Sequence, residues 1–103
     1  MRTPEGKVKD AVVKQIKALG AYYFFPVSGG FGVSGTPDIV GCINGKFFAF
    51  ECKAGKNKPT ALQEKAIRNI NESGGVAVVI NEQNVHDVTD ILLGLRDATQ
   101  TAS

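Results

Sequence analysis

The chain has 103 residues, of which 43% are apolar and 21% are charged, a composition typical of a globular protein with one core. We therefore expect a single domain over residues 1–103. No apolar run reaches the length of a membrane span and no signal-peptide pattern is present, so we expect no membrane role and a cytoplasmic location. The net charge of +2 is too small to indicate a nucleic-acid partner by itself.

The first predicted element is an amphipathic helix. Thr3 can cap it, Pro4 suits the first helical position, and Glu5 is favourable beside the positive helix N-terminus. Gly20 ends it. Its buried stripe at helical spacing consists of Val8, Val12, Ile16 and Leu19. Four lysines on it either form a solvated face or contact phosphates: Lys7, Lys9, Lys14 and Lys17.

Residues 21–27 predict a strand with four consecutive aromatic residues, two on each face. Both faces then need cover, one by the core and the other by a helix or a second subunit. Residues 30–35 fit the dinucleotide pattern G-x-G-x-x-G, but a β-branched strand follows where that pattern requires a helix, so we reject it. Gly30 and Gly32 instead predict a loop that lets a nucleic-acid strand approach closely.

Residues 35–53 predict a β-hairpin. Asn44-Gly45 lies between two apolar runs and favours a two-residue turn with positive φ at both positions. If residue 43 faces residue 46, the same register sets Asp38 directly opposite Glu51. Because side chains alternate, Asp38, Glu51 and Lys53 then share one face. The other face is apolar: Ile39, Ile43, Phe48, Phe50 and Cys52.

Two opposed carboxylates destabilise a sheet unless positive charge lies between them. A divalent cation with the Lys53 ammonium beside it meets this need, and Mg²⁺ commonly uses one or two carboxylates together with waters and phosphates. The alternative is that Asp38 is an exposed turn residue and that Glu51 and Lys53 are a solvated pair. Cys42 and Cys52 point to opposite faces, so we expect neither a disulfide nor a zinc site.

The rest of the chain predicts a helix, a strand and a helix. Thr60 and Gln63 form a capping box, and the buried stripe that follows consists of Leu62, Ala66, Ile67 and Ile70. Residues 76–80 suit a strand buried on both faces and reached by a parallel crossover. Asn84 is the expected cap of a last helix, and residues 97–103 a frayed tail. The predicted order is α-β-β-β-α-β-α, an α/β fold.

Asp38 after residues 35–37, with Glu51 and Lys53 at the end of the next strand, resembles the motif of the PD-(D/E)xK nuclease superfamily. With the helix acid Glu5 and the Thr60-x-x-Gln63 helix start, the chain is similar to the stand-alone phage and bacterial members of its VRR-NUC family. The resemblance implies a restriction-endonuclease-like αβββαβ core with a mixed sheet flanked by helices. It also implies a homodimeric, Holliday-junction-resolvase-like endonuclease that cuts DNA in a bacterial or phage-infected cell.

The same resemblance implies roles for single residues. Asp38, Glu51 and the Cys52 backbone carbonyl would bind Mg²⁺ or Mn²⁺, and Glu5 would contact the metal through water. Lys53 would act on the attacking water and the phosphate, with Gln63 in support. From charge alone, Lys56 and Lys58 are expected to contact DNA.

Two other interpretations remain open. The first is a noncatalytic nucleic-acid-binding module with the same fold. The second is a small interaction protein without nucleic-acid binding. Cleavage separates the nuclease from the first, and DNA binding at low salt separates both from the second.

Overall fold

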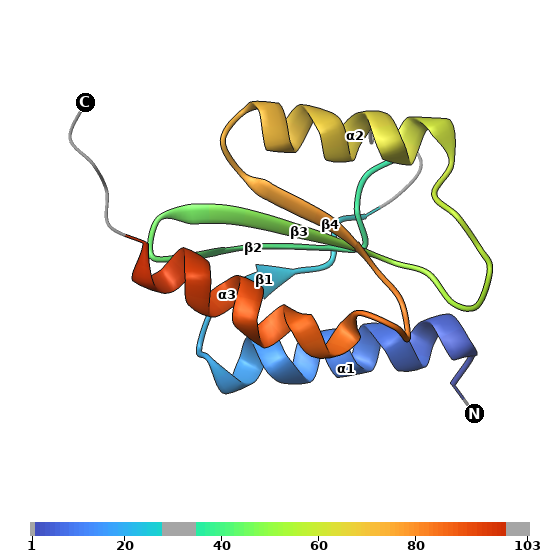
Figure 1. The fold of residues 1–103 in the computed structure, drawn as a ribbon, viewed down its shortest axis with the longest axis horizontal. Helices are drawn as coiled ribbons and strands as arrows, with labels where there is room; N and C mark the ends of the chain where they lie inside the picture. The colour runs from blue at the N-terminus through green and yellow to red at the C-terminus, as the bar shows by residue number, and fades with distance from the viewer. Residues whose placement is uncertain (1, 28–34, 99–103) are drawn as a thin grey trace.

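The computed structural model describes residues 2–27 and 35–98, which form an α/β fold with three layers (Figure 1). Helix α2 covers one face of a four-stranded mixed sheet of order β1-β2-β3-β4, and helices α1 and α3 cover the other. The elements are α1 (Pro4–Ala18), β1 (Tyr22–Phe24), β2 (Ile39–Ile43), β3 (Lys46–Cys52), α2 (Ala61–Glu72), β4 (Val76–Ile80), the 3-10 helix η1 (Val85–Asp87) and α3 (Val88–Asp97). The predicted order of helices and strands is confirmed, with the 3-10 turn as an addition.

The hairpin of β2 and β3 has the predicted turn and register. Asn44 and Gly45 have φ values of 50° and 76°, as a two-residue turn of this type requires. The pairing runs from Ile43 opposite Lys46 to Ile39 opposite Phe50. This register fixes which side chains of the hairpin face each helix layer.

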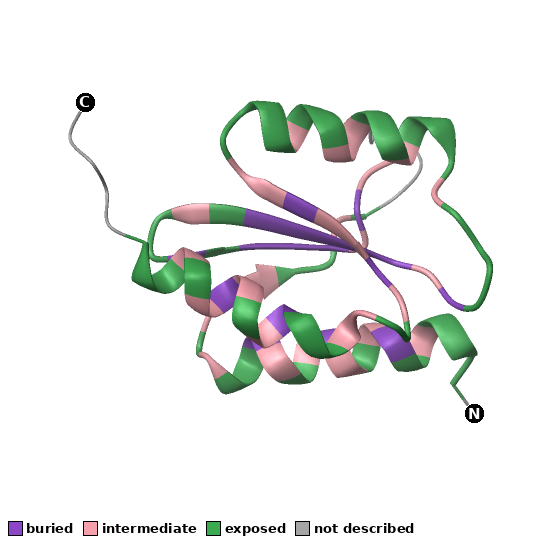
Figure 2. Cartoon of the chain, in the orientation of Figure 1, coloured by how far each residue is buried: buried purple, intermediate pink, exposed green. Residues whose placement is uncertain are grey.

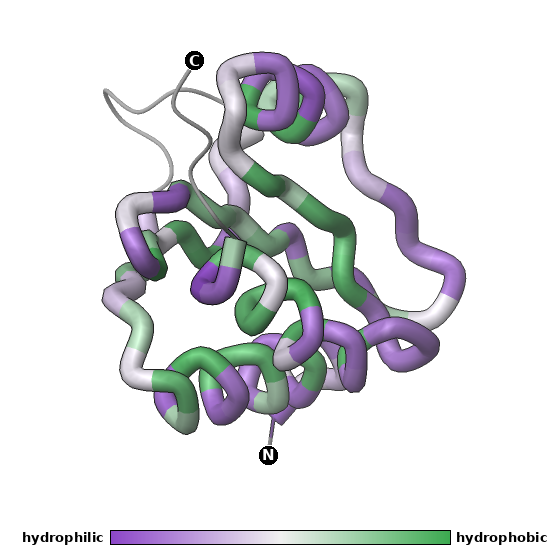
Figure 3. The backbone as a smooth tube through the Cα atoms, turned by 60° about the vertical axis from the view of Figure 1, so that its left-hand side comes forward, coloured by the Kyte–Doolittle hydropathy of each residue, from purple (hydrophilic) through white to green (hydrophobic). Residues whose placement is uncertain are grey.

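Two apolar clusters lie on the two faces of the sheet. The larger cluster packs the hairpin face that carries Phe48 and Phe50 against α1 and α3. The smaller one packs Val40 and Ala49 against Ile67 and Ile70 of α2. Strand β3 is buried along most of its length, whereas α2 is largely exposed (Figure 2). The strands are correspondingly hydrophobic, while the helices alternate between hydrophobic and hydrophilic residues (Figure 3).

Strand β4 pairs in parallel with β3, as expected from the intervening helix. It lies at the edge of the described sheet, and only Ala77 and Ile80 are buried in it. Ala77 packs toward α2 and Ile80 toward α1 and α3, so the predicted cover on both faces is present at these residues, whereas the other three residues of this edge strand are only half-buried.

Three other details differ from the sequence-based predictions. Leu62 is 53% exposed because α2 packs on the sheet through later residues of its stripe. Asn84 makes no side-chain cap, since its amide bonds Val79 and Asn81 instead. Within β1, Tyr23 is half-buried but Tyr22 and Phe24 are exposed, so the second face of this strand has no cover among the described residues.

The loop predicted around Gly30 and Gly32 and the end of the predicted tail lie outside the described residues. In the part that is described, no helix is long and apolar enough to cross a membrane.

Candidate active site

The candidate site lies where the hairpin strands end, beneath the first turn of α2. Asp38 immediately precedes β2 and Glu51 is the penultimate residue of β3. Continuing the hairpin register by one step beyond Ile39 and Phe50 sets these residues opposite each other, at a position where the strands exchange no hydrogen bonds and side chains approach most closely. The sequence prediction that the turn brings the two acids together is supported by this geometry.

Pro37 explains how Asp38 is held. In the hairpin register Cys52 faces residue 37, and a residue there would normally exchange both backbone hydrogen bonds with it. Proline has no N–H to donate, and the Cys52 N–H instead donates to Asp38 Oδ2 at 2.9 Å. Since the N–H and C=O of a strand residue point to the same side, the Cys52 carbonyl is also directed toward Asp38 and receives no N–H from Pro37. The proline thus leaves the Cys52 carbonyl without the hydrogen bond that a residue at position 37 would normally donate.

Gly35 brings the chain close to α2 just before Asp38. Its φ is +85°, and a Cβ atom there would come within 2.4 Å of the Leu62 carbonyl oxygen. Only glycine fits this approach without a shift of backbone. The glycine thus fixes the path of residues 35–38 against the N-terminal turn of α2.

Glu51 is the buried charged residue of the described core, with 2% of its surface exposed. Its Oε2 atom accepts a hydrogen bond from Gln63 Nε2 at 3.2 Å and lies 3.6 Å from Lys53 Nζ. Its Oε1 atom is buried and has no hydrogen-bond partner among the described residues. An unsatisfied buried carboxylate oxygen is strongly unfavourable, so Oε1 has the properties of a ligand atom for a cation.

Burial and, to a smaller extent, the neighbouring Asp38 carboxylate together raise the pKa of Glu51 to about 7, against the opposing effect of Lys53. Near neutral pH the metal-free protein therefore holds a partly protonated carboxyl group here. A divalent cation would favour the ionised form of Glu51 and remove the repulsion from Asp38.

The Cys52 side chain has no role in this site. The thiol is free and buried in the cluster on the α1 and α3 face. Burial, with smaller contributions from Asp38 and Glu51, raises its pKa to about 12, so the thiol stays protonated. The expectation that this residue contributes only its backbone fits this environment.

The Gln63 side chain makes two contacts, one that caps α2 and one with Glu51. Its Oε1 accepts from the Thr60 N–H at 2.9 Å and completes the predicted capping box, while its Nε2 donates to Glu51. The capping pattern in the sequence predicted the bond with Thr60. The bond with Glu51 could not be predicted in this way, because it depends on how α2 packs over β3. The cap of α2 therefore holds a donor against Glu51.

Glu5 has no contact with the carboxylate pair among the described hydrogen bonds and ion pairs. It lies in the first turn of α1 and lines a hollow of about 720 Å³ together with Ala54, Gly55 and Lys56. In the described part of the chain no hydrogen bond or ion pair joins Glu5 to Asp38 or Glu51. The structure thus places Glu5 beside the segment that follows Lys53, and its predicted contact with a metal through water stays a prediction.

The segment after Lys53 carries the two predicted DNA-contacting lysines. Lys56 and Lys58 are both exposed. Glu82, which the sequence analysis missed, accepts hydrogen bonds from the Gly55 N–H at 3.0 and 3.2 Å. It thereby ties this segment to the chain after β4. No local pattern marks Glu82, because the contact joins residues 27 positions apart.

Within the described ranges, no group of three or more His, Cys, Asp and Glu side chains is arranged to hold a metal. A cation here would rest on two carboxylates, a backbone oxygen and water, which is a common arrangement for Mg²⁺. No protein-family model matches the sequence, and no curated protein matches it significantly. The chemistry of the site itself must therefore carry the functional argument.

Proposed function

We propose that this protein is a metal-dependent DNA endonuclease with a restriction-endonuclease-like core of the PD-(D/E)xK type, similar to the VRR-NUC family. The observation that carries the proposal is the buried, unpartnered Oε1 of Glu51 beside Asp38 and Lys53. A fold that needed only a core would gain stability from an apolar residue at this position. A carboxylate kept here without a full set of partners is typical of a functional site.

The residues present fit Mg²⁺ or Mn²⁺. Asp38, Glu51 and the Cys52 carbonyl offer oxygen ligands, which are those that such hard cations prefer. The bound ion would supply Lewis-acid polarisation of the phosphate and would lower the pKa of bound water. Gln63 holds one oxygen of Glu51, so that the other remains available to the ion.

Lys53 is suited to contact the scissile phosphate. Its side chain is only 14% exposed, and its ammonium lies on the same face as the carboxylate pair. A fixed positive charge in a partly buried position stabilises negative charge that develops on a phosphate in the transition state. The exposed Lys56 and Lys58 would neutralise phosphates further along the DNA.

The proposed substrate is branched DNA, such as a four-way junction, cut by a homodimer with one site in each subunit. The exposed aromatic side chains of β1 support a dimer interface there: Tyr22 is 68% exposed and Phe24 is 48% exposed. The last helix is a poorer interface, because Val88 and Leu92 of its apolar side are already buried in the core. A nuclease of this kind would act in the cytoplasm of a bacterial or phage-infected cell.

The test is cleavage of a labelled four-way junction and a matched duplex in Mg²⁺ or Mn²⁺. Asp38→Asn and Lys53→Ala should bind both substrates but cut them at least about 100-fold more slowly than the wild type. Lys46→Ala is the matched control, since Lys46 begins β3 at the opposite end of the hairpin, and it should cut normally.

The ratio of the two wild-type rates measures structure selectivity. If the wild type binds DNA without cutting it in any divalent metal, the protein is a noncatalytic binding module and the nuclease proposal is wrong. If it does not bind DNA at low salt, an interaction protein of another kind is the better interpretation.

A further inference from the structure

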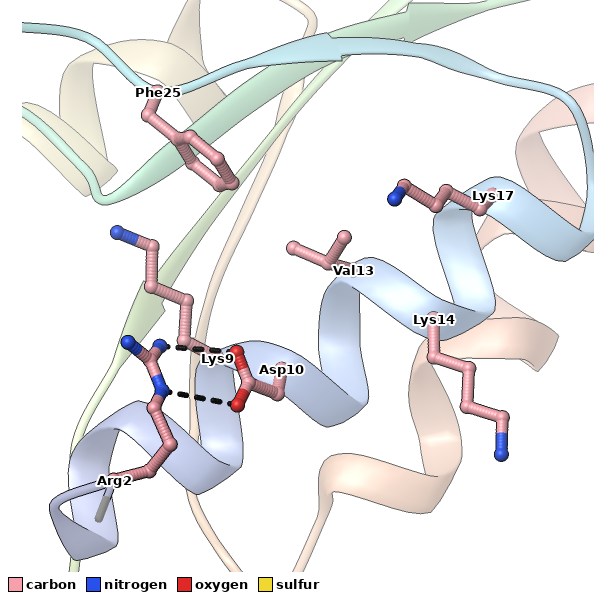
Figure 4. A pocket seen from close by; sticks show the side chains of 7 residues that line it. All are labelled: Arg2, Lys9, Asp10, Val13, Lys14, Lys17 and Phe25. Atoms are coloured by element: carbon pink, nitrogen blue, oxygen red, sulfur yellow. Dashed lines mark hydrogen bonds and ion pairs between the residues drawn. The ribbon is translucent and has the colours of Figure 1, made fainter.

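A basic groove of about 530 Å³ lies along α1 and is separate from the carboxylate pair. Its charged lining consists of Arg2, Lys9, Asp10, Lys14 and Lys17. Phe25, just after β1, forms the opposite wall (Figure 4). Cationic residues outnumber the acidic ones four to one in this lining, so the groove favours an anionic ligand.

The single acid of the groove does not neutralise its lysines. Asp10 is held by Arg2 in a bidentate pair, with Nε to Oδ2 at 3.0 Å and Nη2 to Oδ1 at 2.9 Å. Among the ion pairs of the described residues, none includes Lys9, Lys14 or Lys17. The charges of these three lysines are therefore not neutralised by an acid among the described residues.

Phe25 adds a flat apolar surface to this positive lining. Phe25 is 49% exposed, and the Lys9 ammonium lies 4.4 Å from the centroid of its ring. In Figure 4 the side chains of Lys9 and Lys17 extend on the side of α1 that faces Phe25, whereas that of Lys14 points away. Lysines beside an exposed aromatic ring are typical of surfaces that bind single-stranded nucleic acid, with phosphates on the cations and a base on the ring.

The groove begins close to the candidate active site. Arg2 and Lys9 of the groove flank Glu5 at the start of α1. Glu5 in turn lines a hollow with residues 54–55, which follow the end of β3. Lys9 and Lys17 are separated by eight positions, about 12 Å along the helix axis. That length corresponds to about three nucleotides of a stacked strand.

We propose that this groove binds an unpaired DNA segment next to the bond that is cut, with Lys9 and Lys17 on phosphates and Phe25 against a base. The proposal rests on the nuclease function proposed above. It adds that the unpaired segment of a branched DNA substrate binds along α1. A duplex could place phosphates on the lysines of the groove but no base on Phe25, because the bases of a duplex are stacked on one another and cannot contact the ring without unstacking.

The test measures binding in EDTA, where no cleavage occurs, by fluorescence anisotropy with labelled oligothymidine and with the same strand paired to oligodeoxyadenosine. Lys9→Ala and Lys17→Ala should each weaken single-strand binding about fivefold at 0.1 M salt and reduce the salt slope by about 0.7. Phe25→Ala should weaken single-strand binding about fivefold or more and leave duplex binding unchanged. Lys7→Ala is the matched control, because Lys7 is an exposed lysine of α1 outside the groove.

Unchanged single-strand binding in the three groove variants would overturn the proposal. Equal losses on strand and duplex in Phe25→Ala would also overturn it, because the groove would then bind duplex. A wild type that cuts DNA while the groove variants bind normally refutes only the groove assignment. Groove variants that lose binding while the wild type never cuts refute only the nuclease function.

Discussion

Glu51 is the residue whose environment is hardest to explain by stability alone. Burial disfavours its charge, the opposed Asp38 adds repulsion, and Lys53 compensates only in part. The strand register brings Asp38 opposite Glu51, and Lys53, two positions along the chain, lies 3.6 Å from Glu51 Oε2. The metal-free protein must therefore either protonate Glu51 or tolerate a buried charge.

This environment predicts a specific pH dependence in the metal-free protein. The pKa of Glu51 rises from 4.5 to about 7 on folding, so the folded state keeps a proton that the unfolded state loses. The stabilisation is fully present below about pH 4.5 and is lost as the pH rises through about 7. The full difference is about 3 kcal/mol.

Urea unfolding in EDTA at pH 5 and pH 8 checks this. The wild type should lose more stability between the two pH values than Glu51→Gln, whose side chain cannot ionise. Glu72→Gln removes an exposed carboxylate of α2 and should behave like the wild type. Parallel pH dependence in the wild type and Glu51→Gln would show that Glu51 is not destabilised by its surroundings.

At the scale of elements, the hairpin was the part most completely predictable from sequence. Asn44-Gly45 specifies its turn chemically, and the turn then sets every pair from residue 43 back to residue 39. The start of α1 was equally local, since Thr3 accepts the predicted capping bond from the Gly6 N–H. These predictions succeeded because the interactions that decide them join residues a few positions apart.

Contacts between elements could not be predicted in this way. The exposure of Leu62, the bond from Gln63 to Glu51 and the bond from Gly55 to Glu82 all depend on how α2 and the segments beside it pack. Asn84 failed as a predicted cap for the same reason, because its amide bonds the end of β4. The sequence therefore predicted that Asp38 and Glu51 lie opposite each other and the resemblance named Gln63, but the bond from Gln63 to Glu51 was not predicted.

Gly41 joins β1 and β2 by a close approach that predicts a large effect of substitution. A Cβ atom there would lie 2.1 Å from the Tyr22 carbonyl oxygen and 2.5 Å from Cζ of Phe48. Gly41→Ala should therefore destabilise the fold by about 1–3 kcal/mol or more, because either the backbone of β1 or a core ring must move.

Gly94→Ala is the matched control for this substitution. Apart from the backbone of α3 itself, no atom of the described residues lies within 4 Å of a Cβ at Gly94, so alanine should stabilise this helix by up to about 1 kcal/mol. Chemical denaturation of both variants measures the contrast. A Gly41→Ala variant as stable as the wild type would contradict the tight packing of β1 on β2.

At the scale of the whole molecule, the two faces of the sheet are covered unequally. Helices α1 and α3 together cover one face, while α2 packs on β3 and β4 of the other (Figure 1). Three aromatic side chains remain exposed on the strands of the second face: Tyr22, Phe24 and Phe47. Contiguous exposed aromatic surface of this kind is typical of protein interfaces.

The proposed dimer can be tested through this surface. Sedimentation velocity at micromolar concentration should show a dimer for the wild type and a monomer for the Tyr22→Ser, Phe24→Ser double variant. Leu62→Ser removes an equally exposed apolar side chain at the first turn of α2 and should remain dimeric. A wild-type monomer under these conditions would remove the dimer from the proposed mechanism.

The most direct test of a metal site at Asp38 and Glu51 is calorimetric titration with Mn²⁺ at pH 6, in two buffers of different ionisation enthalpy. Because the pKa of Glu51 is about 7, metal binding to the wild type should release about one proton for each ion bound. Asp38→Asn and Glu51→Gln should lose binding, whereas Lys53→Ala should retain it. Binding of equal strength in all four proteins, without proton release, would show that the two carboxylates do not form a metal site.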